Sequence, residues 1–525
     1  DDVYCQYAHE SNAKIFQQDG FSPLYDEGWN FETIRKENLF LQKVGNCEMD
    51  ESLRERFKAE VRAMRAWTYL GMTMTFGKVP LITEVLDYNA PNIPRDEVSV
   101  IRDFIMKELT EAAAILPEKY AGGYPNEKGR ITKYACLSLK ARAALYFGDY
   151  ALAESTAKEV MDKGGFSLFK ISSLSDAQKK EAEEMSLYID FAEKGIDKDE
   201  FVKGMFNYEA LWHTENANPD NPEYIMTRQY AASSWDYQDM TRYTSMRPNQ
   251  LGGWSSVTPT QNLVDAYWGV DGHSVPQLPT PEERAKAYNQ IKADLDAYQK
   301  PEGEAKFIAF CQEKIKNGTL KDYKYIQEFR NRDSRMYVSI LMPFKSWYES
   351  NYGDKFVYEW IKNGNNESKT GFNFRKMLSL ENDANGDGQA TGDYPCIRYA
   401  EILLIYAEAH TQTTGYDAAT EAALNQLRDR CGMPDVPSGL SKEEGLKLIQ
   451  NERRIELAGE GFRGDDMTRY SDDYWKEHMN NVPIMTPDGD TELTMKWSSR
   501  MRLKPIPQTA IDLNPLLAGD QNPGY

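Results

Sequence analysis

Histidine and cysteine are scarce in this chain, which has five His and six Cys among 525 residues. The cysteines are far apart and form no CxxC pair, which argues against a zinc or thiol-redox motif. No two histidines have the HExxH spacing of a metallohydrolase. Cys136 and Cys431 fall in apolar helical patterns and are interpreted as small buried hydrophobic residues. A hydrolase built on a histidine base or a His-rich metal site would have few residues to use.

Positive charge is also in the minority, with 62 Lys and Arg against 82 Asp and Glu, a net charge of −20. A general nucleic-acid binder needs a basic surface, so no nucleic-acid partner is expected. The same acidity disfavours docking on an anionic lipid surface. No apolar run approaches the ~20 residues that span a bilayer. The chain starts at Asp1 without a signal-peptide core, and we expect a processed or trimmed start.

Two segments far apart in the chain share one helical design. Residues 133–163 and 399–431 each contain an Ala-rich amphipathic helix, a short turn with glycine, and a second Ala-rich helix. The turns begin at Gly148 and Gly415, where glycine adopts the left-handed conformation that ends a helix. The small residues allow two helices to approach closely. This design is typical of tetratricopeptide-like helix pairs, although the full consensus is absent.

Further apolar periodicity predicts helices over residues 27–44, 57–77, 98–116 and 442–459, with a helical insert near 175–203. In 57–77, the spacing of Phe57, Val61, Met64 and Trp67 predicts one apolar face, with Trp67 in the core. The remaining middle of the chain is rich in Asn, Pro, Gly, Trp and Tyr, which is typical of surface loops. We therefore predict one interleaved unit over 1–525. It comprises a helical scaffold at about 25–165 and 396–470, a loop-rich ligand-binding half at about 166–395, and a C-terminal segment at 471–525.

Seven segments in order resemble the SusD-like (SusD/RagB) family of outer-membrane lipoproteins of Bacteroidetes. They are FKAEVRAMRAWTYLGMTMTFGKVPLITE (57–84), PTQNLVDAYWGVDGHSVP (259–276), NRDSRMYVSILMPF (331–344), KTGFNFRKM (369–377), YPCIRYAEILLIYAEA (394–409), NERRIELAGEGFRGDDMTRY (451–470) and the ending RLKPIPQTAIDLNPLLAGDQNPGY. Each motif alone is modest, but their common order is specific. The resemblance covers nearly the whole chain from about residue 25.

The resemblance implies a mainly α fold, with four tetratricopeptide-like helix pairs packed against an irregular, loop-rich half with small β elements. It also implies a non-catalytic protein that captures a glycan and delivers it to a SusC-like TonB-dependent transporter. Family members sit on the cell surface, held in the outer membrane by an N-terminal lipid anchor. That anchor lies outside this chain, and Cys5 is not assigned as its cysteine.

Aromatic residues make up 12% of the chain, and some of them lie in loops. A pyranose ring offers apolar C–H faces for stacking and hydroxyls for hydrogen bonds to planar polar groups. The predicted ligand contacts are Trp254 after two glycines, Trp235 among polar neighbours, and Tyr88 with Asn89 after the VPLITE turn. Packing into the scaffold is the alternative for each of them. Weaker candidates are Trp212, His213, Trp347 and Trp360.

Residues 383–388 read Asp-Ala-Asn-Gly-Asp-Gly, the start of a calcium-loop pattern. Asp383, Asn385 and Asp387 would supply hard oxygen ligands at alternate positions. Position twelve is Tyr394 and not the bidentate Glu of an EF-hand, so a solvated turn is the alternative. No cofactor is required by the predicted function, and a calcium ion here would be structural.

Charged blocks near the C-terminus are interpreted as structural. Glu452, Arg453, Arg454 and Glu456 alternate along one predicted helix, where i,i+4 ion pairs are expected. Arg332, Asp333 and Arg335 are expected to fix a loop through bidentate ion pairs.

Other functions remain open at this point. The same architecture could bind peptide or another nutrient, and helix-repeat proteins often serve as protein-interaction scaffolds. A glycoside hydrolase would need two carboxylates at a defined separation. With 82 acidic residues some pair always exists, and no spacing singles one out.

Overall fold

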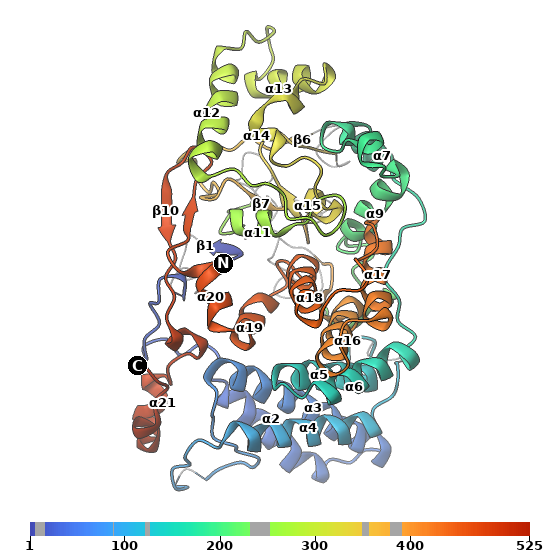
Figure 1. The fold of residues 1–525 in the computed structure, drawn as a ribbon. Helices are drawn as coiled ribbons and strands as arrows, with labels where there is room; N and C mark the ends of the chain where they lie inside the picture. The colour runs from blue at the N-terminus through green and yellow to red at the C-terminus, as the bar shows by residue number, and fades with distance from the viewer. Residues whose placement is uncertain (6–15, 88, 121–126, 231–252, 349–355, 379–390) are drawn as a thin grey trace.

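The computed structural model describes residues 1–5, 16–87, 89–120, 127–230, 253–348, 356–378 and 391–525. The fold is mainly α-helical, with short two-stranded sheets between the helices (Figure 1). Helices from the first third of the chain form the lower part of the view, and helices from its middle form the upper part. The predicted mainly α fold is confirmed.

The N-terminal helices pack in sequence order. They are α2 (Phe31–Lys43), α3 (Glu51–Phe76), α4 (Val98–Ile115), α5 (Lys133–Tyr146) and α6 (Tyr150–Lys163), each in contact with the next. Asp50 caps α3 by accepting hydrogen bonds from the amides of Ser52 and Leu53. Gly148 has φ +74°, so the α5–α6 turn uses the left-handed glycine that the sequence predicted.

The C-terminal helices continue this array. Helix α16 (Tyr399–Thr413) packs on α6, while α17 (Ala418–Cys431) and α18 (Lys442–Glu456) pack on α16. The turn between α16 and α17 has Gly415 at φ +113° and Asp417 as the N-cap of α17. Ala153, Ala157 and Ala423 are fully buried, as expected where helices approach closely. Two segments separated by more than 200 residues thus form one scaffold.

The buried face of α3 differs from the predicted one. Alanines at positions 59, 63 and 66 are fully buried, whereas Met64 remains 38% exposed and Trp67 lies at the edge of the core. Both α2 and α4 pack against α3, and small side chains permit their close approach. The prediction of Trp67 as a core residue was therefore wrong in detail, although the helix itself is confirmed.

The middle of the chain is more helical than its composition suggested. Helix α9 (Lys198–Ala210) packs against α17 and α15 (Ser334–Ser339). Short helices α7 (Asp176–Glu184), α11 (Gln261–Ala266) and α14 (Lys324–Gln327) belong to the same half, with α12 (Pro281–Ala297) and α13 (Lys306–Lys316) at the top of Figure 1. The sequence analysis missed α12 and α13. This half has its own hydrophobic core, which includes Phe206, Tyr337 and Trp347.

Short antiparallel strand pairs connect distant segments. The pairs are β1 (Val3–Cys5) with β3 (Val257–Pro259), β2 (Tyr224–Arg228) with β8 (Tyr394–Arg398), β4 (Ile340–Leu341) with β7 (Asn373–Phe374), β5 (Ser346–Trp347) with β6 (Phe356–Val357), and β9 (Pro483–Met485) with β10 (Thr491–Thr494). Strand β8 leads directly into α16, so the β2–β8 pair attaches the middle half to the helical scaffold.

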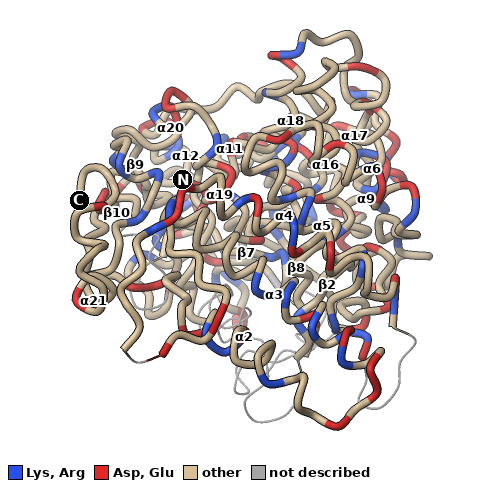
Figure 2. Tube along the Cα trace, turned by 90° about the horizontal axis from the view of Figure 1, so that it is seen from below, with Lys and Arg blue, Asp and Glu red and all other residues tan. Residues whose placement is uncertain are grey.

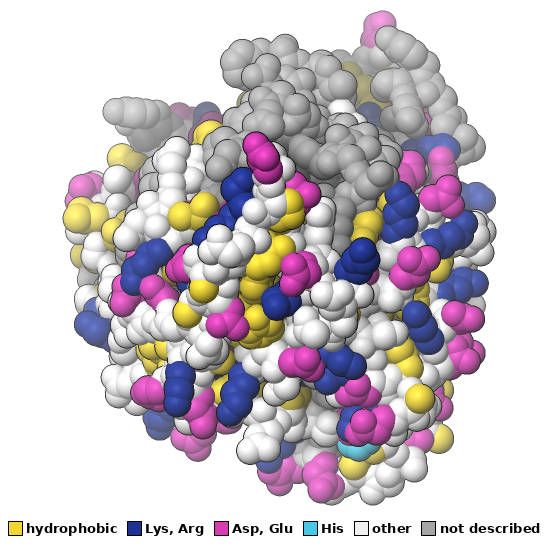
Figure 3. Space-filling model, turned by 90° about the horizontal axis from the view of Figure 1, so that it is seen from above, with side chains coloured by type: hydrophobic (Ala, Val, Ile, Leu, Met, Phe, Trp, Pro, Cys, Tyr) yellow, Lys and Arg dark blue, Asp and Glu magenta, His cyan; other side chains and the backbone are white. Residues whose placement is uncertain are grey.

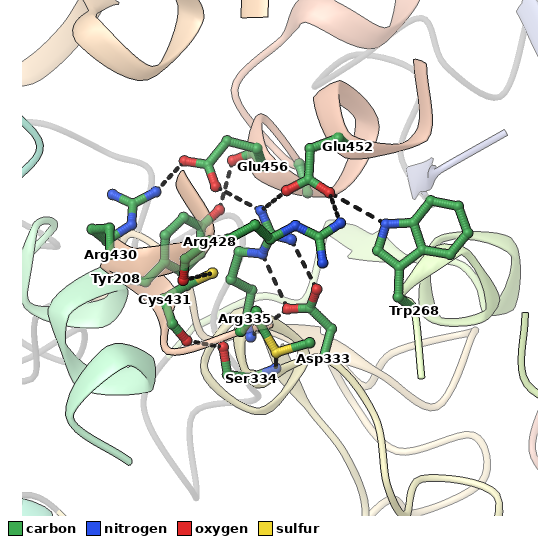
Figure 4. Close-up of polar contacts among 12 residues, drawn as sticks. Tyr208, Trp268, Asp333, Ser334, Arg335, Arg428, Arg430, Cys431, Glu452 and Glu456 are labelled. Carbon is green, nitrogen blue, oxygen red and sulfur yellow. Dashed lines mark hydrogen bonds and ion pairs between the residues drawn. The ribbon is translucent and has the colours of Figure 1, made fainter. Parts of the chain in front are cut away.

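A buried network of charges also joins the two halves (Figure 4). Glu456 of α18 accepts from Arg335 of α15 at 2.9 Å and from Arg398 at 2.8 Å, and it also pairs with Arg430 of α17. Glu452, one turn earlier, pairs with Arg335 at 2.7 Å and Arg428 at 2.6 Å. Burial alone would raise the pKa of Glu456, but the guanidinium groups of Arg430, Arg398 and Arg335 hold that pKa well below its usual range.

The ion-pair partners of these charged residues differ from the predicted ones. The partners of Glu452 and Glu456 come from α15, α17 and β8, whereas i,i+4 pairs along α18 were expected. The expected bidentate pair between Asp333 and Arg335 is confirmed, at 3.0 and 2.8 Å. Arg332 instead donates to the backbone carbonyls of Val264 and Tyr267.

The C-terminal segment returns to the N-terminal helices. After α19 (Phe462–Arg469) and α20 (Asp472–Met479), the chain forms the β9–β10 hairpin and then α21 (Gln508–Leu513), at the left of Figure 1. Asn522 donates to the carbonyl of Phe76 at the end of α3. Among the helices of the described residues, none is both long and apolar enough to cross a membrane.

Charges of both signs are interspersed over the molecule. Seen from below, acidic residues alternate with Lys and Arg along the trace (Figure 2). Seen from above, apolar side chains occupy small areas separated by charged ones (Figure 3). The described residues visible in these two views show no continuous basic stripe of the kind that tracks a phosphate backbone.

Candidate ligand-binding site

The loop between α3 and α4, residues 79–96, carries the predicted contact Asn89 at its exposed tip. Its base is closed by a bridge between Val79 and Asp96, and Asp96 also accepts from the amide of Leu81 at 2.8 Å. The buried Asn38 of α2 donates to the carbonyls of Ile82 and Glu84 at 3.0 and 3.1 Å. These bonds hold residues 79–84 and Asp96 in place at the base of the loop, which reduces the entropy lost on binding a ligand.

The C-terminal segment fixes the other side of the same loop. Asn514 donates to the carbonyl of Ile93 at 2.7 Å. Arg95 donates to Asp520 at 2.9 Å and to Asn522 at 2.9 Å. The hydrogen bond from Arg95 lowers the pKa of the Asp520 carboxyl. The loop is thus held between α2 and the last turns of the chain.

A groove of about 330 Å³ lies between the loop and the C-terminal segment. Trp29 and Phe31 line it, together with Leu86, Asp87 and residues 90–93 of the loop and residues 509–517 opposite them. The Trp29 ring is supported by Phe76 at 5.0 Å and Phe31 at 5.2 Å. A volume above about 300 Å³ with aromatic lining falls in the range of small-molecule sites.

The predicted contacts fall on different parts of this arrangement. Asn89 is exposed between two groove-lining residues, Asp87 and Ala90. Tyr88 and Trp235 lie outside the described residues. Trp254 belongs to a different element: it is half-buried, just before β3, and the next residue, Ser255, has φ +47° in the left-handed region. The sequence did not point to Trp29, Phe31 or residues 509–517 as neighbours of Asn89.

The weaker aromatic candidates are packing residues. Trp212 is 6% exposed, with Lys376 and Arg398 over its ring, and Trp347 is 1% exposed with Arg375 over its ring. Trp360 is buried and donates its indole N–H to the carbonyl of Ser368. Buried rings have no free face for a ligand, so the alternative of scaffold packing holds for all three.

A second cavity, of about 340 Å³, lies between residues 1–3 and helices α18 and α19. Three arginines in its lining are already paired: Arg453 with Asp466, Arg454 with Asp2, and Arg463 with Asp1. Its charges are therefore satisfied within the protein.

The predicted calcium ligands Asp383, Asn385 and Asp387 lie outside the described residues, so the calcium loop stays a prediction. Within the described ranges, no cluster of three or more His, Cys, Asp and Glu residues is arranged to hold a metal ion.

Comparison with solved structures finds this fold in SusD-like proteins. A SusD-like protein from Bacteroides fragilis matches with a TM-score of 0.75 at 24% identity, covering 100% of this chain and 92% of that one. A SusD-like carbohydrate binding protein from the same species gives 0.67 at 20% identity, over 98% of this chain and 91% of that one. A laminarin-binding SusD-like protein gives 0.62 at 20% identity, over 100% of this chain and 92% of that one.

Sequence comparison identifies the family. The SusD-like protein P38 of Formosa agariphila is 22% identical over 475 residues, covering 88% of this chain and 73% of that protein. The SusD family model matches residues 222–525, more than half of the chain. The chain belongs to the SusD family, as its motifs predicted.

Proposed function

We propose that this protein is a non-catalytic glycan-binding protein of the bacterial cell surface. The observation that carries the proposal is the groove beside Asn89, lined by aromatic side chains and held by the SusD-like scaffold. Two proteins of the same fold, one carbohydrate-binding and one laminarin-binding, support a saccharide as the ligand class.

Binding in such a groove rests on stacking and on hydrogen bonds. The half-buried faces of Trp29 and Phe31 meet the C–H face of a sugar ring, while Asn89 and the polar groups of the loop meet its hydroxyls. Aromatic contacts contribute about 1 kcal/mol each, so micromolar to millimolar affinity is expected. Weak binding suits a protein that must release its cargo.

The cargo passes, in this proposal, to a SusC-like TonB-dependent transporter, with the protein held at the outer membrane by an N-terminal lipid anchor. Family membership supports both steps. A structural calcium ion bound by Asp383, Asn385 and Asp387 belongs to the same proposal and contributes stability, with no part in chemistry.

A glycan array followed by calorimetry tests the binding step. The wild-type protein is compared with Asn89→Ala and Tyr88→Ala, and with Asn317→Ala, an exposed residue at the end of α13, as the matched control. We expect a glycan hit that weakens about ten-fold in either loop variant and not in the control. Absence of binding to every glycan, or release of shortened products from a bound oligosaccharide, contradicts the proposal.

A further inference from the structure

A smaller cavity of about 160 Å³ lies at the other end of the molecule, between α11, the start of α12, α14 and the β9–β10 hairpin. A water needs about 10–15 Å³ of cavity space measured in this way, so the cavity is large enough for several waters. This volume is about half that of the groove beside Asn89 and is sufficient for one compact polar ligand. None of its lining residues belongs to the groove beside Asn89.

One wall of the cavity is a fixed cluster of polar side chains. Arg284 donates to Glu328 at 2.6 Å and to both oxygens of Asp265 at 2.9 Å. Gln261 donates to the same Oε1 of Glu328 at 2.9 Å and to Asp265 at 2.8 Å. Both donors share Oε1, and among the described residues none donates to Glu328 Oε2. The cluster is thus rigid and leaves one carboxylate oxygen as a free acceptor.

Asn262 adds an amide to this wall. Its backbone carbonyl accepts from Arg454, but its side chain has no hydrogen-bond partner among the described residues, although it lines the cavity. An amide offers a donor and an acceptor side by side. Together with the free oxygen of Glu328 in the same cavity lining, it suits a ligand that carries more than one hydroxyl group.

The cavity also has an apolar wall. Phe372, Pro483 and Met485 line it, and Tyr325, another lining residue, packs its ring against Tyr288 at 5.2 Å. The hairpin that supplies Pro483 and Met485 is anchored, because Lys362 pairs with Asp488 and Asp490 at 2.6 Å each. Gly371 has φ +82°, and a Cβ there would lie 2.1 Å from Pro487 Cγ. The hairpin therefore packs directly on the 370–372 segment, and the wall keeps its shape.

These features select the charge class of the ligand. Arg284 is engaged by two carboxylates, so an anion would meet the acidic oxygens of Glu328 and Asp265 without a free cation to balance it. A metal cation would find one free carboxylate oxygen, Glu328 Oε2, because the other three are bonded to Arg284 and Gln261, and this is fewer ligands than such an ion requires. A neutral polyol satisfies the free acceptor and the amide, and it places C–H groups against Phe372 and the prolines.

We propose that this cavity is a second carbohydrate site, which binds one neutral monosaccharide unit, either free or at the end of a chain. Hydroxyls of the sugar donate to Glu328 Oε2 and bond to the Asn262 amide, and its apolar face lies on Phe372. The proposal rests on the proposed glycan-binding function for the source of the sugar. It adds a contact point that is separate from the groove beside Asn89.

Saturation-transfer NMR on the complete chain tests this site with glucose, galactose, mannose and xylose as probes. At least one of them is expected to receive saturation and to bind with a millimolar dissociation constant. Asn262→Leu keeps the side-chain volume, removes the amide and is expected to weaken binding about ten-fold, because it removes hydrogen bonds at a half-enclosed site. Asn317→Leu, on the exposed end of α13, is the matched control and is expected to bind as the wild type does.

Met485→Trp, which fills the cavity from the hairpin, must produce the same loss as Asn262→Leu. The second site is overturned if none of the four monosaccharides receives saturation, or if Asn262→Leu and Asn317→Leu bind a sugar equally well.

The two proposals fail separately. If a glycan binds on the array, Asn89→Ala loses that binding, and no monosaccharide binds, only the second-site proposal fails. If a monosaccharide binds and Asn262→Leu weakens that binding, while no glycan on the array binds, the result supports the cavity. The same result contradicts oligosaccharide capture in the groove.

Discussion

Glu456 lies 2.9 Å from Arg335, a residue 121 positions earlier in the chain, and neither side chain has any exposure to solvent. Arg335 belongs to α15 in the middle half, and Glu456 belongs to α18 in the scaffold. The same carboxylate also pairs with Arg398 and Arg430. One carboxylate therefore ties the half that contains the monosaccharide-sized cavity to the helices that hold the rest of the fold.

Replacing Glu456 with Gln is expected to lower the free energy of unfolding by about 3–5 kcal/mol. The change removes the negative charge while three guanidinium groups remain buried around the site. Urea denaturation measures the loss.

Glu443→Gln provides the control on the same helix. Glu443 pairs with Lys447, but their side chains are 81% and 72% exposed. Exposed pairs contribute little, so this variant is expected to stay within about 0.5 kcal/mol of the wild type. Equal effects of the two substitutions would mean that the buried network does not hold the halves together.

Trp254→Ala and Trp235→Ala test the remaining aromatic contacts that the sequence predicted. If either ring stacks on a sugar, the affinity for a glycan found on the array falls by about 1 kcal/mol, near a five-fold change in dissociation constant. Calorimetry measures that change. Phe40→Ala, a 37% exposed aromatic of α2, is the control and should bind normally. Unchanged affinity in both tryptophan variants would leave the groove beside Asn89 as the place of the contacts.

The helices were predictable where local signals agreed with one another. The Gly148 and Gly415 turns lie where expected. In both turns the aspartate that follows, Asp149 or Asp417, is the N-cap of the second helix, a role that the sequence analysis did not assign. Helix α12 was missed although Thr280, Pro281 and Glu283 form a capping box with proline in the first turn. The capping box is visible in the sequence, but the surrounding Asn- and Pro-rich composition favoured a prediction of loops for this part of the chain.

Tertiary relationships were not available from local patterns. The spacing of Glu452 and Glu456 suggests pairs along one helix, whereas their partners come from three other elements. In the same way, the groove beside Asn89 is completed by residues 509–517, more than 400 positions later. Only the packing of the whole chain brings such segments together.

The calcium prediction is tested by titration of the metal-free protein. Calorimetry with Ca²⁺ is expected to give one binding event, and saturating Ca²⁺ should raise the melting temperature, because an ion that binds only the folded state stabilises it. The triple variant Asp383→Ala, Asn385→Ala, Asp387→Ala should lose both effects. Asp473→Ala, an exposed acid of α20, is the control. If the triple variant still binds Ca²⁺, the ion is held by other residues and the predicted loop is wrong.

Glu37 of α2 gives the stability a pH dependence of known sign. Burial raises the pKa of Glu37 from 4.5 to about 7, opposed only in part by the hydrogen bond from Thr68 and the charge of Arg65. One of its carboxylate oxygens is buried without a partner. The folded state therefore holds a proton that the unfolded state has already released. The contribution of Glu37 to stability therefore falls as pH rises from about 4.5 to about 7, and then levels off.

Glu37→Gln accepts the same bond from Thr68 without ionising, so it removes this dependence. Urea midpoints are measured at pH 5, 6, 7 and 8. The midpoints of the wild type and Glu37→Gln should be similar at pH 5, and the variant should become increasingly more stable than the wild type up to pH 7. Glu32→Gln, an exposed residue on the same helix whose pKa is lowered by Lys36, should not follow that trend. A constant difference between wild type and Glu37→Gln across this range would mean that Glu37 is ionised throughout, with its charge solvated or paired in the folded protein.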